Sequence, residues 1–102
     1  MGKIRKRKIH WEPSSSGEVI KYKLYWSETG AVDYDSAFKE LGNVTQVVLP
    51  DDVSSFPLSA GEIELGITGV TSEGNESDFV RVSSHFDFTV PEAPKNLIVE
   101  DL

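Results

Sequence analysis

Apolar and polar residues alternate in several short segments of this chain. This is the period of a β-strand, because successive side chains of a strand point to opposite faces. The even-numbered positions of residues 19–26 are apolar, and so are the odd-numbered positions of residues 63–67. Each segment therefore predicts a strand with one buried face. The positions that we expect in the core are Ile20, Tyr22, Leu24, Trp26, Leu65 and Ile67.

Turn-forming residues separate these segments from further short strands. A strand over residues 6–11 ends at the run Pro-Ser-Ser-Ser-Gly, and its last residue, Trp11, is also expected in the core. Residues 44–49 are rich in β-branched side chains, and residues 79–83 alternate again after a polar loop. Several short strands with a turn every eight to twelve residues are typical of a β-sandwich. The pattern predicts an all-β fold.

One segment favours a helix instead. Residues 35–41 begin with an aspartate that suits a helix N-cap, contain good helix formers, and precede a glycine. We expect one or two helical turns there, at the edge of the sandwich.

Length and composition fit one folded domain. The chain has 102 residues, of which 38% are hydrophobic and 26% are charged. A chain of this length buries enough surface for a single core, and its composition is too apolar for a disordered segment. Its sequence holds no cysteine and no apolar run long enough to span a membrane. We therefore expect no disulfide, no membrane span and no export signal within this chain.

Charge is distributed unevenly. The formal net charge is −7, but five of the ten basic residues lie between Lys3 and Lys8, so the remainder carries five basic and seventeen acidic residues, a charge of −12. Such an acidic body repels nucleic acid and anionic lipid. The basic segment is either a contact for such a partner or a solvated strand edge, where lysine discourages pairing with other strands. The second interpretation is favoured, and no nucleic-acid partner is expected.

An ordered set of residues resembles the fibronectin type III family, in the version found in bacterial extracellular proteins. The set consists of Trp11, Glu12, Pro13, Tyr22, Leu24, Trp26, Ile63, Leu65, Ile67, Gly69, Val70 and the segments 42–45 and 74–79. The match covers residues 6–83. The resemblance implies an immunoglobulin-like two-sheet sandwich over residues 1–90, in a larger extracellular or cell-surface protein. The family's first strand is missing before residue 6.

Residues 91–102 resemble the opening of another domain of the same family, with Leu97 and Val99 on one face of a short strand. Two interpretations remain open. Either this tail is a linker into the first strand of a following repeat, or it supplies the missing first strand. In the second case it returns to its own body or is donated to a neighbouring molecule, forming a homo-oligomer.

Catalytic chemistry has little support in the sequence. A nucleophile, a base and an orienting group must converge in a cleft, and the only histidines, His10 and His85, lie in or beside strands without a second ligand at metal spacing. Acidic pairs such as Asp33 with Asp35 do not follow a calcium-loop pattern. We expect no enzyme activity, no cofactor and no metal.

Two regions are candidates for contacts with partners. One is the outward face of residues 19–26, with Lys21, Lys23 and Tyr25, and the other is the loop that contains Glu73 and Asn75. The sequence favours a non-catalytic structural, spacer or adhesion-type module next to other domains of one parent chain. The alternative, which the resemblance also implies, is an accessory module that binds carbohydrate or protein and is attached to a secreted glycan-degrading enzyme.

Overall fold

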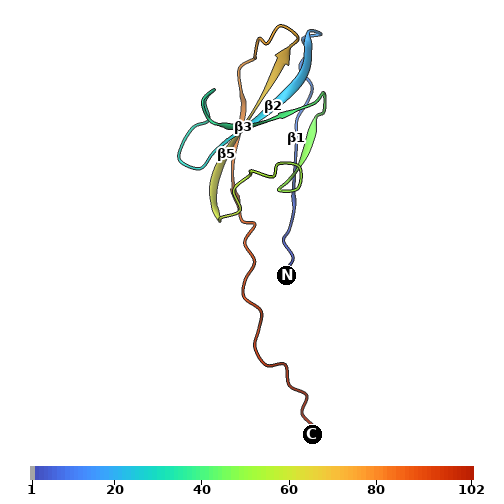
Figure 1. Cartoon of the computed structure of the whole chain (residues 1–102), viewed down its shortest axis with the longest axis vertical. Helices are drawn as coiled ribbons and strands as arrows, with labels where there is room; N and C mark the ends of the chain where they lie inside the picture. The colour runs from blue at the N-terminus through green and yellow to red at the C-terminus, as the bar shows by residue number, and fades with distance from the viewer. Residues whose placement is uncertain (1) are drawn as a thin grey trace.

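Six antiparallel strands form two sheets in the computed structural model, which describes residues 2–102 (Figure 1). The strands are β1 (Arg7–His10), β2 (Val19–Ser27), β3 (Ala37–Leu41), β4 (Gln46–Leu49), β5 (Gly61–Thr71) and β6 (Val80–Phe86). A four-stranded sheet has the order β3-β2-β5-β6, and a two-stranded sheet pairs β1 with β4. The predicted all-β, two-sheet sandwich is confirmed.

The core lies between the two sheets. From β2 and β5 it takes the alternating side chains that the sequence singled out, since Tyr22, Leu24, Trp26, Leu65 and Ile67 are all buried. Full burial of a side chain of this size contributes about 1.5–3 kcal/mol, so this layer is the main source of stability. The other members of the cluster are Val47, Leu49, Val53, Phe56, Ile63, Phe86 and Phe88.

Ile20 does not join the core, and this prediction was wrong. Its side chain is 49% exposed. The pairing of β2 with β5 shifts between Val19 and Lys21, and a β-bulge of this kind turns one side chain away from the alternating pattern. Val19 packs against the core instead. Trp11 is partly buried, with its ring edge-on to Tyr22 at a centroid distance of 5.8 Å.

The predicted helix at residues 35–41 is also wrong. Asp35 belongs to a tight turn, in which its amide donates to the Asp33 carboxylate and the Ser36 amide donates to the Asp33 carbonyl. Residues Ala37–Leu41 then form β3, which pairs with β2 from Tyr22 to Trp26. Pairing with a neighbouring strand overrides the local helix preference, because that preference amounts to only a few tenths of a kcal/mol per residue.

Arg7 connects the start of β1 to the end of β6 at one end of the sandwich. Its guanidinium lies 4.8 Å from the centre of the Phe86 ring and donates a hydrogen bond of 2.9 Å to the His85 carbonyl. The start of β1 and the end of β6 therefore lie at the same end of the molecule. Beyond β6, Phe88 is still buried, and its amide donates to the Leu58 carbonyl.

The C-terminal tail leaves the body at this end (Figure 1). Residues 91–102 form no strand, and every side chain in them is exposed, including Leu97 at 100% and Val99 at 92%. The first part of the tail runs beside the N-terminal segment, where Gly2 lies against Val90. Whether the tail is a linker or the first strand of another domain stays a prediction. Within residues 2–102, no helix has the length and apolar character needed to cross a membrane.

Candidate functional site

An aromatic cluster covers the outer face of the four-stranded sheet, opposite the core. At its centre is Tyr25 in β2, whose ring lies 5.3 Å from the ring of Phe38 in β3 and 5.0 Å from that of Phe79. The ring of Tyr34, in the turn before β3, lies 4.7 Å from Phe79 and meets Tyr25 edge-on. Edge-on and tilted aromatic pairs at these distances are favourable beyond the apolar area that they bury.

Tyr25 lies on the outer face, as predicted, but it is only 2% exposed. We expected Tyr25 to be available on this face for contact with a partner, but three aromatic neighbours from other segments cover it. The exposed rings of this face are instead those of Tyr34 and Phe38, at 51% and 48%. We call Tyr25, Tyr34, Phe38 and Phe79 the outer aromatic cluster.

Glu76 ties the loop after β5 to this cluster. Its carboxylate accepts hydrogen bonds from the Tyr25 hydroxyl and, at 2.6 Å, from the Thr68 hydroxyl. The Lys23 ammonium lies 3.4 Å from the same carboxylate and 4.8 Å from the centre of the Phe38 ring. The Glu76 side chain is only 17% exposed, so its charge needs these partners.

The pKa values of the pair follow from this geometry. Burial, followed by the hydrogen bond to Glu76 and its charge, raises the pKa of Tyr25, which stays protonated as a donor. Burial alone would raise the pKa of Glu76, but the hydrogen bonds from Thr68 and Tyr25 and the Lys23 charge together hold it below its ordinary value. At neutral pH the carboxylate is therefore charged and works as an acceptor.

The remaining predicted contact residues are dispersed. Lys21 forms an ion pair with Glu40 on β3, which holds the pKa of that carboxyl below its usual value. Glu73 and Asn75 are exposed in the loop after β5, where the Asn75 carbonyl accepts a hydrogen bond from the Thr71 amide. Of the five predicted contact residues, only Lys23 and Tyr25 share a partner, which is the Glu76 carboxylate.

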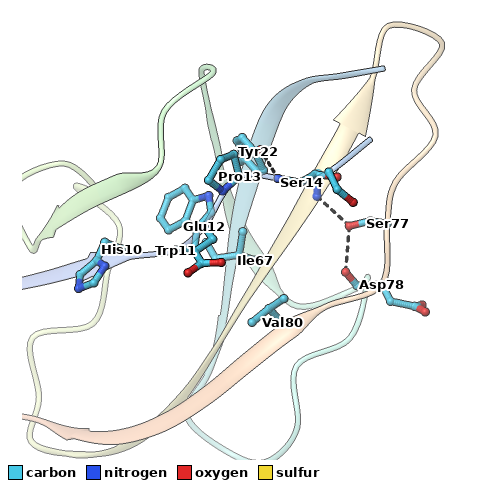
Figure 2. A pocket seen from close by; sticks show the side chains of 12 residues that line it. His10, Trp11, Glu12, Pro13, Ser14, Tyr22, Ile67, Ser77, Asp78 and Val80 are labelled. Carbon is cyan, nitrogen blue, oxygen red and sulfur yellow. Dashed lines mark hydrogen bonds between the residues drawn. The ribbon is translucent and has the colours of Figure 1, made fainter. Parts of the chain in front are cut away.

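A second candidate surface is a groove on the open side of the sandwich, between β1 and β6. It consists of two adjoining hollows of about 580 and 200 Å³, both lined by His10, Trp11, Ile67 and Val80. Figure 2 shows Trp11 and Val80 on the two sides of the larger hollow, with Ile67 between them. On the β6 side, Val80 and Val82 are 70% and 53% exposed. We call this region the β1/β6 groove.

Trp11 leaves one polar atom without a partner in this region. Its indole Nε1 is buried, and no acceptor for it exists among residues 2–102. A buried donor without a hydrogen bond costs about 1–3 kcal/mol, so most such groups in folded proteins have a partner. The groove thus combines exposed apolar side chains with an unsatisfied donor in its wall.

Metal-binding side chains do not gather in the part of the chain that the structure describes. No three histidine, aspartate or glutamate side chains of residues 2–102 lie close enough to hold a metal ion. His10 and His85 are both exposed, on β1 and β6.

Sequence reasoning missed Tyr34, Phe38 and Phe79 as members of a surface. The helix expected at residues 35–41 concealed Phe38, because a strand there would have placed it on one face of β3. Tyr34 lies in a turn, where alternation carries no signal, and Phe79 was expected only as the first residue of a strand over residues 79–83, whereas it precedes β6. No family model matches this chain, and no similar curated protein or solved structure is found.

Proposed function

We propose that this chain is a non-catalytic interaction module of adhesion or spacer type, one of several domains in a larger extracellular or cell-surface protein. Its direct partner is a neighbouring domain of the same parent chain or a protein ligand. The resemblance of residues 6–83 to fibronectin type III domains supports a place among other domains of an extracellular or cell-surface protein.

The outer aromatic cluster is the observation that carries this proposal. Tyr34 and Phe38 expose about half of their rings, while buried Tyr25 and the hydrogen bonds of Glu76 hold them in place. The Tyr34 hydroxyl donates to the Ser77 carbonyl at 2.8 Å, which fixes its ring further. Rigid aromatic side chains lose little entropy on binding and are enriched at the centres of protein interfaces.

A second candidate function is an accessory carbohydrate-binding module of a secreted glycan-degrading enzyme. The same two exposed rings favour it, because a flat apolar ring stacks on the face of a sugar ring while nearby polar groups bond its hydroxyls. The two candidates share a surface and differ in the partner.

A pull-down on insoluble cellulose, chitin and xylan separates the two candidates. If the chain binds carbohydrate, the polysaccharide retains it, and Phe38→Ala and Tyr34→Ala reduce this retention. The control Leu58→Ala, at an exposed apolar position elsewhere, leaves retention unchanged. If the chain binds protein instead, no polysaccharide retains it, and a purified neighbouring domain of the parent chain shifts the NMR signals of Tyr34 and Phe38. Release of soluble sugar by the chain alone would contradict a non-catalytic role.

A further inference from the structure

Two strand edges are open on the side of the β1/β6 groove. In residues 2–102, β1 pairs only with β4, and β6 pairs only with β5. The Trp11 amide donates to the Thr45 carbonyl, on the β4 side. Since amides alternate in direction along a strand, those of Lys8 and His10 point to the open edge. An open edge beside an apolar groove is suited to accept an added strand.

The tail has the properties of such a strand. Residues 97–101 form no strand and pair with no other segment among residues 2–102, and Asn96 before them has a left-handed backbone with φ 54°. Leu97 and Val99 fall on one face of this segment and are almost fully exposed, at 100% and 92%. Apolar side chains that remain in water gain free energy when another surface covers them.

We propose that the β1/β6 groove binds the tail of a second copy of this chain, with residues 97–101 added as an antiparallel strand beside β1. This deepens the proposed function, on which it rests, by naming one partner of the module. Leu97 and Val99 enter the groove next to Trp11 and Ile9. The docked strand brings carbonyl oxygens to the amides of Lys8 and His10.

Charge selects the direction and register of the added strand. The tail carries Glu100 and Asp101 directly after its apolar residues, and β1 begins with Arg7 and Lys8. Antiparallel pairing of Leu97 with Trp11 places Glu100 opposite Lys8 and Asp101 opposite Arg7. Opposite charges in facing positions stabilise a strand pair.

A parallel strand fits less well. With Leu97 opposite Ile9, parallel pairing places Glu100 opposite Glu12, where like charges repel. Charge complementarity therefore favours the antiparallel arrangement.

The chain's own tail cannot easily occupy this position. An antiparallel strand must enter beside Trp11, at the far end of β1, whereas the tail leaves beside Arg7. Because Phe88 is anchored in the core, only residues 89–96 remain to run the length of the groove and reverse direction. Those residues extend about 29 Å at most, and the returning arm would have to share the groove with the outgoing one. A second copy has no such constraint.

Solution mass is the first test. Sedimentation of the full chain from about 10 μM to about 1 mM should show a monomer that forms dimers or larger assemblies as concentration rises. The variant Leu97→Asp with Val99→Asp should weaken association by about tenfold or more, because it places charges in an apolar groove. The control Ile98→Asp changes a tail residue that is 70% exposed and lies on the opposite face of the segment, and it should retain association. A monomer at every concentration, or equal weakening by the control, overturns the proposal.

Cross-linking tests the register, and the chain has no native cysteine to interfere. A Lys8→Cys chain mixed with a Glu100→Cys chain should form a disulfide between copies, since facing strand residues lie within the span of that bond. The control pair, Glu12→Cys with Glu100→Cys, should form far less. Preferential cross-linking of the control pair overturns the antiparallel assignment. Loss of association leaves polysaccharide and neighbouring-domain binding at the outer aromatic cluster unaffected, so the two proposals fail separately.

Discussion

The Tyr25 hydroxyl on β2 donates a hydrogen bond to the Glu76 carboxylate, which lies 51 positions further along the chain. This bond joins the outer face of the large sheet to the loop after β5. With Thr68 and Lys23, it satisfies a carboxylate that is largely removed from water. The exposed rings of Tyr34 and Phe38 therefore pack against residues that charge-assisted hydrogen bonds hold in place, and such bonds are stronger than neutral ones.

Removing the Tyr25 hydroxyl should destabilise the fold. Tyr25→Phe keeps the ring but takes one donor from a poorly solvated carboxylate, and we expect a loss of about 1–2 kcal/mol in the free energy of unfolding. Urea denaturation measures this loss. Tyr34→Phe is the matched control, because its hydroxyl bonds a carbonyl at the exposed surface and its loss should be smaller. A larger effect of the control would show that the Glu76 network contributes little.

Glu76 should make stability depend on pH. Its folded pKa lies below the ordinary value of 4.5, so the unfolded chain binds more protons at acidic pH. Its contribution is fully present above that value and is lost as the pH falls through the lower folded pKa. Glu76→Gln should cost about 1–2 kcal/mol at neutral pH, and thermal melts should show the gap to the unchanged chain closing as the pH falls below 4.5. A gap that stays constant over this range would contradict the assignment.

Gly66 on β5 should tolerate no larger side chain. A Cβ atom there would lie 2.7 Å from Phe79 Cδ1 and 2.8 Å from Val32 Cγ2, closer than packed carbon atoms approach. Gly66→Ala should therefore cost about 1–3 kcal/mol and displace Phe79, visible as shifted Phe79 ring signals in NMR spectra. Gly42→Ala, at a position with open space, serves as the control. Equal stability of the two variants would mean that the outer aromatic cluster is loosely packed.

The sequence predicted the core better than the surfaces. Alternation along β2 and β5 identified buried residues such as Tyr22 and Leu65, because a half-buried strand has a strict period of two. The same rule failed at Ile20, where a bulge interrupts the period, and at residues 35–41, where local preference favoured a helix. A bulge and a strand pairing both depend on residues distant in sequence, so neither can be derived from the local pattern.

Both candidate surfaces lay beyond the reach of the sequence for a related reason. The outer aromatic cluster joins rings from β2, β3 and two loops, and Tyr25 had no local feature to indicate that Tyr34 and Phe79 would cover it. The open side of β1 follows from the pairing order of the strands. The role of residues 91–102 stays a prediction, which rests on their resemblance to the opening of a domain.

Amide hydrogen exchange along β1 tests the open edge most directly. In dilute solution the account predicts slow exchange for the Ile9 amide, which faces β4, and exchange close to the unprotected rate for the Lys8 and His10 amides. Protection of Lys8 and His10 should then rise with protein concentration. If these two amides are as protected as Ile9 in the dilute chain, the edge is already covered, and the account of an open groove is wrong.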